Sequence, residues 1–416
     1  MYKSPKELNE MNFKIKRVLT LSIGILFNCH FLIAQDYSGP LGVEAALEPP
    51  TINTSPLPEY DYDRLDYAMT IGIERTSKGR IWACWVGGGD NDDAFFVLST
   101  SDDKGESWSK PRVVIDPHDS RLLSKRNVIV GNLWLDPTGR LWLFFSQSMS
   151  FYDGRMGNWY TICENPDDDN PVWSEPVRMW HGCSLNKPTI LSDGTWLLGV
   201  SLWVRHRITD DYKEMFHELD SLRGANIFLS RDKGNTWERK GHVLFPKWNY
   251  DELHVVELNN GTLWMTARTG DGIWQSFSKD KGQSWSEPSK YMEHTSSRHF
   301  LRRLQSGRLL LVKHGDIDQK TRGRSQLKAF ISDDDGKTWK GGLMLDERRG
   351  ISYPDGFQAP DGTIYISYDR NRDNDGHILM ARFTEKDVLN GAFKSRNSKA
   401  KILISQPLGI EIKREY

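Results

Sequence analysis

The chain has 416 residues and a formal net charge of -1, with 38% hydrophobic and 27% charged residues. This is the composition of a soluble globular protein, and so small a net charge creates no long-range field that attracts nucleic acid or an anionic membrane. We therefore expect no nucleic-acid partner, and an anionic ligand would need a local cluster of Arg or Lys. The 16 Trp residues exceed ordinary usage and suit both β-structure and sugar-binding surfaces.

A basic segment followed by an apolar run opens the chain. Residues 18–34 are mostly apolar and follow three basic residues, so residues 1–35 are predicted to be a signal peptide that starts at Met11. A membrane anchor is the alternative, but it needs about 20 cleaner apolar residues. Lipid attachment at Cys29 is disfavoured because bulky residues precede it. We expect a secreted or periplasmic protein with no membrane span after signal removal.

Three cysteines remain in the predicted mature chain: Cys84, Cys163 and Cys183. An odd number without metal-like spacing indicates neither a disulfide framework nor a zinc site. The sequence also carries no cofactor motif, so no cofactor is expected.

A short pattern recurs six times through most of the chain. Each copy is a turn glycine followed by an apolar and aromatic strand, and the copies begin at Gly79, Gly139, Gly194, Gly261, Gly307 and Gly362. Strand-length apolar runs separated by turns, with almost no helical periodicity, indicate an all-β protein. Six such units in radial repetition predict a six-bladed β-propeller.

A second repeat, Ser-x-Asp-x-Gly-x-Thr/Ser-Trp, is interleaved with the first. It occurs at residues 101–108, 230–237, 278–285 and 332–339, and a degenerate copy ends at Trp173. In such a box the Asp accepts backbone N–H bonds, the Gly supplies a positive φ, and the Trp packs under the turn. We therefore assign the box aspartates a structural role away from the propeller axis.

The repeats define the expected domain boundaries. Residues 61–390 are predicted to form the propeller as one domain, after an extended, proline-rich lead-in over residues 36–60 and before a short basic tail over residues 391–416. The unit from Gly362 to Phe383 has no box of its own. We expect the ring to be closed there by the strand around Tyr67–Glu74.

The boxes and the six units resemble the sialidase superfamily over nearly the whole predicted mature chain. The stretch from Glu252 to Arg268 is similar to the segment that carries the glutamate partner of the nucleophile and the second arginine of a carboxylate-binding triad. Arg324 resembles the third arginine of that triad. Tyr353 falls where the family has its tyrosine nucleophile, and Asp90 where it has its acid/base aspartate.

The chemistry implied by this resemblance is coherent. A sugar whose anomeric carbon bears a carboxylate repels a carboxylate nucleophile, so such enzymes use a tyrosine whose proton is taken by a nearby glutamate. Arginine side chains hold the substrate carboxylate through paired hydrogen bonds. An aspartic acid protonates the leaving oxygen.

One departure from the family pattern lies on the first strand. The family has an Arg-Ile-Pro motif there, whereas this strand reads DYAMTIGIER, with Met69 at about the place of the arginine. Arg75 has the wrong phase on the strand to replace it, and Gly87–Gly89 stand where the family has a further basic residue. Loss of one charged hydrogen bond costs about 1.5–3 kcal/mol, which argues against an ordinary sialidase.

Four further polar residues are candidates for the site. Arg126, Asn186 and Lys187 open inner strands, whose starts line the axial mouth where propellers bind ligands, so we expect them to bind substrate. His254 is two residues past Glu252 and is expected on the same face of the strand, where it could act as a base.

Three functions follow from these residues. The first is an exo-glycosidase acting on a terminal uronic or sialic-type acid of an oligosaccharide or polysaccharide, with Tyr353, Glu252 and Asp90 in the roles above. The second is β-elimination from a terminal uronic acid by a lyase or dehydratase, with Tyr353 or His254 as base and Asp90 as acid. The third is a sugar-binding propeller without catalysis, against which the retained catalytic set argues.

Overall fold

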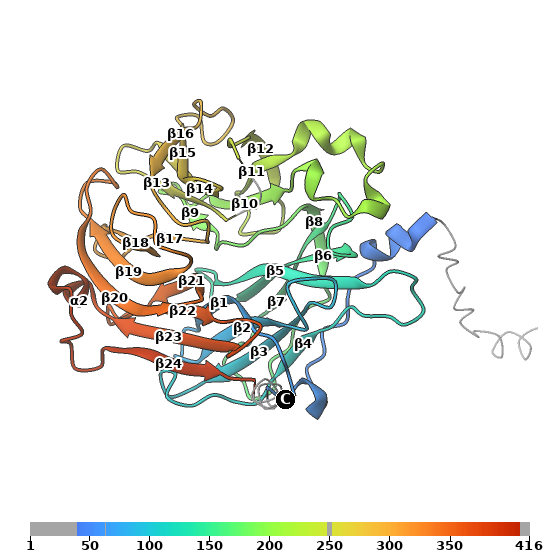
Figure 1. Ribbon diagram of the computed structural model, residues 1–416, viewed down its shortest axis with the longest axis horizontal. Coiled ribbons are helices and arrows are strands. Elements are labelled where there is room, and N and C mark those ends of the chain that lie inside the picture. The colour runs from blue at the N-terminus through green and yellow to red at the C-terminus, as the bar shows by residue number, and fades with distance from the viewer. Residues whose placement is uncertain (1–39, 63, 248–251, 408–416) are drawn as a thin grey trace, which may run out of the picture. The chain divides into compact units, whose positions relative to one another are not determined.

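Antiparallel strands dominate the computed structural model, which describes residues 40–62, 64–247 and 252–407. They form six sheets of four strands each, arranged in a ring (Figure 1). The fold is therefore the six-bladed β-propeller predicted from the repeats. The predicted signal peptide lies outside the described residues.

Each blade consists of four strands that follow one another in the chain. The first two blades contain β1 (Met69–Arg75), β2 (Ile81–Gly87), β3 (Phe95–Ser101) and β4 (Val113–Ile115), then β5 (Arg126–Leu135), β6 (Leu141–Met149), β7 (Gly157–Cys163) and β8 (Val177–His181). The next two contain β9 (Thr189–Ile190), β10 (Trp196–Leu202), β11 (Gly224–Ser230) and β12 (Glu238–Val243), then β13 (Leu253–Glu257), β14 (Leu263–Thr269), β15 (Gly272–Ser278) and β16 (Ser289–Met292). The last two contain β17 (Phe300–Arg303), β18 (Leu309–His314), β19 (Ser325–Ser332) and β20 (Lys340–Arg349), then β21 (Ile351–Gln358), β22 (Ile364–Arg370), β23 (His377–Phe383) and β24 (Lys399–Ser405).

Helical segments are few and short. They are the 3-10 helices η1 (Pro40–Leu47), η2 (Pro58–Tyr60), η3 (Arg205–Arg207), η4 (Asp210–Tyr212) and η5 (His217–Leu222), and the α-helix α2 (Glu385–Asn390). No helix in the described ranges has the length and apolarity needed to cross a membrane.

The hydrophobic core lies between neighbouring blades. One cluster joins the last two blades through residues such as Val312 and Ile366, and another joins the last blade to the first through Trp85 and Met380. Because both faces of a blade are covered by its neighbours, strands such as β2 and β14 are buried along their full length. Cys84, Cys163 and Cys183 are all buried within this structure.

The boxes close the turns between the two outer strands of their blades. In the box at residues 278–285, the Ser278 hydroxyl accepts a hydrogen bond from the Gly282 amide at 2.8 Å, and the Asp280 carboxylate accepts one from the Ser284 amide at 2.9 Å. The Trp285 indole donates to the Gly282 carbonyl at 3.1 Å. The box aspartate thus forms its hydrogen bonds within its own turn, which is the structural role that the sequence predicts.

The ring closes differently from the expectation. Lys399–Ser405 form β24, which pairs with β23 as the outermost strand of the last blade, so part of the predicted tail belongs to the propeller. The strand around Tyr67–Glu74 instead forms β1, the inner strand of the first blade. The physical reason is that Ile402 and Ile404 complete the core between the last blade and the first, a role that needs no box.

The lead-in is docked on the propeller rather than extended throughout. The Gln147 side chain donates to the carbonyls of Ala46 at 2.9 Å and Glu48 at 2.8 Å, and Asn53 bridges to Val114 on β4. Residues 40–53 therefore cover the edges of the first two blades.

Candidate functional site

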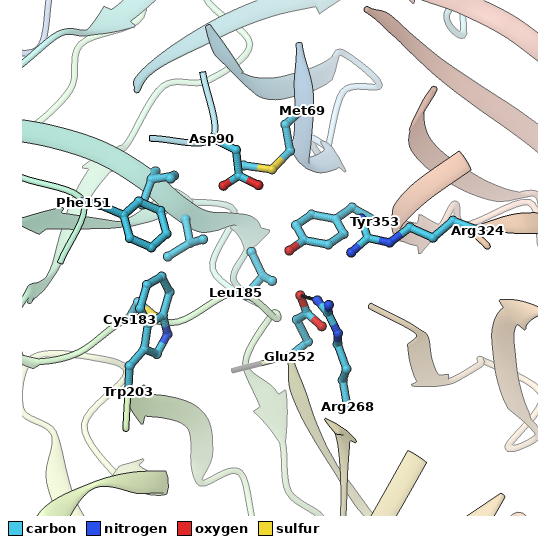
Figure 2. A pocket seen from close by; sticks show the side chains of 12 residues that line it. Met69, Asp90, Phe151, Cys183, Leu185, Trp203, Glu252, Arg268, Arg324 and Tyr353 are labelled. Carbon is cyan, nitrogen blue, oxygen red and sulfur yellow. Dashed lines mark hydrogen bonds and ion pairs between the residues drawn. The ribbon is translucent and has the colours of Figure 1, made fainter. Parts of the chain in front are cut away.

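A pocket lies where residues on or beside the first strands of several blades meet. It is lined by Met69, Asp90, Ile129, Val130, Phe151, Cys183, Leu185, Trp203, Glu252, Arg268, Arg324 and Tyr353 (Figure 2). The catalytic candidates Asp90, Glu252 and Tyr353 and the binding candidates Arg268 and Arg324 are all among them. The structure thus brings together five residues that lie far apart in the sequence.

Three of the inner strands depart from regular pairing beside this pocket. The register shifts between Thr70 and Gly72 in β1, between Val128 and Gly131 in β5, and between Ser352 and Asp355 in β21. Bulges of this kind turn side chains away from the normal alternation of a strand and are frequent next to active sites. They allow Ile129, Val130 and Tyr353 to face the pocket.

Tyr353 has a strained backbone. Its φ of 53° lies in the left-handed region, which a bulky aromatic residue seldom adopts and which costs of order 1–3 kcal/mol. The residue is nevertheless buried, with 8% of its surface exposed. The surrounding structure therefore holds the phenol in one orientation.

Glu252 and Arg268 form a buried ion pair beside the phenol. Arg268 Nη1 donates to Glu252 Oε1 at 2.6 Å, while Glu252 Oε2 is buried and has no hydrogen-bond partner among the described residues. Burial lowers the pKa of Arg268, but the Glu252 carboxylate and the Tyr353 phenol raise it by more. The pKa of Arg268 therefore lies above its usual value. Figure 2 shows the carboxylate of Glu252 and the hydroxyl of Tyr353 pointing into the same part of the pocket.

The environment keeps Tyr353 protonated at neutral pH. Burial and the Glu252 carboxylate raise the pKa of Tyr353, and the positive charges of Arg268 and Arg372 oppose that rise. A phenol in this state becomes a nucleophile only when a base takes its proton as it reacts. Glu252 has an unoccupied oxygen for that proton.

Asp90 is presented at the mouth of the pocket by a glycine turn between β2 and β3. Gly88 and Gly89 have φ values of 83° and 153°, and a Cβ on Gly88 would lie 1.9 Å from the Asp93 carbonyl oxygen. These glycines, which replace the family's basic residue, let the turn fold tightly. The Asp90 side chain is 53% exposed, so it is open to a leaving group that projects toward solvent.

Arg324 is a half-buried cation beside Tyr353. Its Nη1 donates to the Ser352 hydroxyl at 2.8 Å and its Nε to the Ser296 carbonyl at 3.4 Å, and its guanidinium lies 5.6 Å from the Tyr353 ring. Burial and the neighbouring Arg372 lower its pKa. No carboxylate in the described part of the chain forms an ion pair with it, which leaves a positive charge facing the pocket.

Lys187 and Asn186 lie outside the pocket lining. Lys187 Nζ contacts Asp355 Oδ2 at 3.0 Å and the Ile73 carbonyl at 2.7 Å, and Asn186 bonds to Arg298 at 2.9 Å. Their polar atoms tie inner strands together, and the structure does not place either residue among those that line the pocket. Lys187 precedes β9, and its buried ammonium is stable there because the buried Asp355 carboxylate accompanies it.

Arg126 and His254 are also placed away from the pocket. Arg126 holds the lead-in through the Ala45 carbonyl at 3.1 Å. His254 Nε2 bonds to the His299 carbonyl at 2.8 Å, and burial lowers its pKa well below the usual value. β13 begins at Leu253, after the glutamate, so strand alternation does not relate His254 to Glu252.

Sequence reasoning missed an aromatic wall opposite the charged residues. Phe151 and Trp203 pack with ring centroids 5.7 Å apart, and Figure 2 shows them across the pocket from Tyr353 and Arg268. Arg223 fixes Trp203 by donating to its carbonyl at 2.7 Å. Both aromatic residues lie in loops, where no sequence pattern marks them. The high Trp content of the chain was the one general signal that aromatic side chains could line a sugar-binding surface.

Sequence reasoning also missed Arg372, in the turn between β22 and β23. Its guanidinium carbon lies 4.1 Å from the centre of the Tyr353 ring, and it forms ion pairs with Asp369 at 3.0 Å and Asp90 at 3.4 Å. No motif marks this arginine in the sequence. Among the described residues, no group of three or more His, Cys, Asp and Glu side chains is arranged to hold a metal ion.

Comparison with known proteins places this geometry in context. The model of the BNR repeat-like domain matches residues 79–366. No curated protein matches the sequence.

Solved structures with the same fold include several sialidases. The Hadza microbial sialidase Hz136 is 20% identical, with a TM-score of 0.56 over 74% of this chain and 64% of that one. The intramolecular trans-sialidase from Ruminococcus gnavus is 14% identical, with a TM-score of 0.57 over 80% of this chain and 97% of that one. The leech intramolecular trans-sialidase is 14% identical, with a TM-score of 0.59 over 80% and 70% of the two chains. The chain thus spans less than two thirds of the length of the Hadza sialidase.

Proposed function

Because the chain belongs to the BNR repeat-like family within the sialidase superfamily, we propose that it is an exported exo-glycosidase that removes a terminal acidic sugar. The observation that carries this proposal is the position of Arg324, a half-buried cation with no carboxylate partner among the described residues, beside Tyr353 and in the same pocket as the Glu252–Arg268 ion pair. A cation so placed is best stabilised by an anionic group of the substrate. The sugar would bear a uronic or sialic-type carboxylate.

The first step would transfer the sugar to Tyr353. Glu252 accepts the phenol proton through its free Oε2 while the phenol oxygen attacks the anomeric carbon. The bond from that carbon to the leaving oxygen breaks, and Asp90 gives the leaving oxygen a proton. The product is a tyrosyl-sugar intermediate and a released alcohol.

The second step would release the sugar with its original configuration. Asp90, now ionised, takes a proton from a water molecule, whose oxygen attacks the anomeric carbon. The bond to the Tyr353 oxygen breaks, and Glu252 returns the proton to the phenol. The side chains end in the protonation states in which they began.

The two sides of the pocket would bind different parts of the sugar. Arg324 and Arg268, which both line the pocket, support binding of the carboxylate through paired hydrogen bonds. Phe151 and Trp203 offer an apolar surface against which the face of a sugar ring can pack. With Met69 in place of one arginine, fewer charged groups hold the acid than in the family pattern.

A substrate panel tests the proposal. The purified protein is incubated with oligosaccharides that end in uronic acids or sialic acids, and with matched neutral oligosaccharides as controls. We expect release of the acidic sugar with the addition of one water molecule, detected by mass spectrometry, and no release from the neutral set. Cleavage of neutral ends at an equal rate would contradict the role of Arg324.

The same panel separates the other two functions. A β-elimination would yield an unsaturated uronate, which absorbs in the ultraviolet and gains no water. Binding without any change in product mass would identify a sugar-binding propeller. Either result would replace the hydrolytic proposal.

A further inference from the structure

Arg372 connects two residues of the proposed catalytic set. Its guanidinium lies 4.1 Å from the Tyr353 ring centre and forms an ion pair with Asp90 at 3.4 Å. Asp369 anchors the same guanidinium at 3.0 Å. Only 11% of the Arg372 side chain is exposed, and it is not among the residues that line the pocket.

The turn that carries Arg372 and the adjoining end of β22 form hydrogen bonds with the residues on both sides of Met69. The Ala68 amide donates to the Arg372 carbonyl at 3.3 Å, and the Thr70 amide donates to Asp369 Oδ2 at 3.1 Å. The last blade therefore places the positive charge of Arg372 beside the part of β1 that carries the uncharged Met69. Neither the strand pattern nor the family resemblance points to this arginine.

We propose that Arg372 is a positioning residue for the glycosidase reaction, holding the face of the Tyr353 ring and the side-chain oxygen Oδ2 of Asp90 in one arrangement. This inference rests on the proposed function. A guanidinium against an aromatic face is attracted by the ring electrons, and the attraction is stronger when both are removed from water. The same charge opposes the rise in the pKa of Tyr353 caused by burial and Glu252, and so favours loss of the phenol proton.

The buried location favours positioning over direct contact with substrate. Arg372 Nη2 is buried and has no hydrogen-bond partner among the described residues, while its Nε and Nη1 are occupied by Asp369 and Asp90. A ligand in the pocket would meet Arg324 and Arg268 first, since they line it. Arg372 therefore acts on the reacting groups from behind Tyr353.

Substitution kinetics test the proposal. Arg372→Met should lower kcat on the acidic substrate by about 10-fold or more with little change in KM, since removal of an interaction with the reacting groups acts on the transition state. Arg372→Lys keeps the charge and should recover part of the loss. Arg370→Met is the matched control, because Arg370 pairs with Asp375 on the same turn, and it should keep the wild-type kcat.

A second variant keeps the test valid if Arg372→Met folds poorly. Asp369 is fully buried, so Arg372→Met is also made together with Asp369→Asn, which removes the uncompensated negative charge. A rise in KM at unchanged kcat would make Arg372 a substrate ligand and overturn the proposal. An equal loss of kcat in Arg370→Met would also overturn it, because the effect would then belong to the turn as a whole.

Hydrogen exchange separates failure of this inference from failure of the proposed function. If the wild-type protein cleaves no acidic glycoside, the proposed function fails, and with it the role of Arg372 in that reaction. Exchange of the backbone amides in residues 88–94 still measures whether Arg372 orders the Asp90 turn. Faster exchange in Arg372→Met than in Arg370→Met supports positioning, whereas equal exchange in the two variants overturns it.

Discussion

Two clusters of buried charge lie among the inner strands, and they differ in how completely they are paired. In the first, Lys187 and Arg298 contact Asp355 at 3.0 and 3.1 Å, and their other hydrogen bonds go to main-chain carbonyls and to the Asn186 side chain. In the second, Arg268 is paired with Glu252, whereas Arg324 has no carboxylate partner among the described residues. The first cluster is complete within the protein, and the second leaves charge for a ligand.

The difference shows how a structural cation is distinguished from a binding one. Both clusters combine basic and acidic side chains, so residue type alone does not identify the site. A buried ion pair that satisfies all its partners adds structural definition, and removal of one member leaves an uncompensated charge. A cation that is held by hydroxyl and carbonyl oxygens alone still has a charge to neutralise, and an anionic substrate can do this.

The largest expected effect is on catalysis, in the incompletely paired cluster. Tyr353→Phe should lower kcat by about 1000-fold or more, because it removes the oxygen that attacks the sugar. Its melting temperature should stay near that of the wild type, since the aromatic ring is kept. Tyr160→Phe, which changes a ring packed against Trp142 at 5.0 Å in another blade, is the control and should remain active. A Tyr353→Phe variant with wild-type kcat would refute the nucleophile assignment.

The completely paired cluster should show the opposite result. Asp355→Asn leaves Lys187 and Arg298 without their shared carboxylate and should lower the free energy of unfolding by about 3–5 kcal/mol. Urea denaturation of Asp355→Asn and of the exposed control Asp211→Asn measures the difference. Equal stability of the two variants would show that the cluster is not structural.

Two arginine substitutions compare the clusters directly. Arg324→Met should raise KM for the acidic substrate by about 10-fold to 100-fold at nearly unchanged stability, because it removes a charge that only the ligand compensates. Arg298→Met should instead destabilise the fold, since Arg298 is fully buried and bonds to Asp355 and Asn186. A destabilised Arg324→Met with normal KM would reverse the interpretation.

A smaller effect should come from two buried histidines near Lys313. Burial lowers the pKa of His299 and of His314 to about 3, with nearby positive charges contributing, while the ordinary value is 6.5. Below pH 6.5 the unfolded chain therefore binds protons at these histidines that the folded protein does not bind. Their contribution to the free energy of unfolding is constant above pH 6.5 and falls as the pH drops toward 3.

The dependence of unfolding on pH measures this effect. His299→Gln should flatten the decline in the free energy of unfolding between pH 6.5 and 4, whereas His217→Gln, an exposed control, should leave it unchanged. The same slope in His299→Gln as in the wild type would show that His299 does not cause the acid sensitivity.

The fold was predictable because the information for it is local and repeated. Each turn glycine and each box specifies a hairpin within a few residues, and six copies specify a ring. The strand at Lys399–Ser405 was missed because it carries neither signal and is stabilised by core contacts to the first blade.

The site was predictable only where a sequence pattern accompanied the residue. Tyr353, Glu252 and Asp90 stand in a known order along the chain. Lys187 and Arg372 could not be assigned because their roles depend on distant partners: Arg372 and Asp90 are 282 residues apart. Such long-range pairs leave no periodicity in the sequence.

The covalent intermediate provides the most direct test of the account. The protein is incubated with a fluorinated acidic sugar that forms the intermediate quickly and releases it slowly, and the labelled peptide is identified by mass spectrometry. The proposed mechanism predicts one sugar attached to Tyr353, and no label in Tyr353→Phe. Turnover of the acidic substrate with no adduct, or with an adduct on another residue, would contradict it.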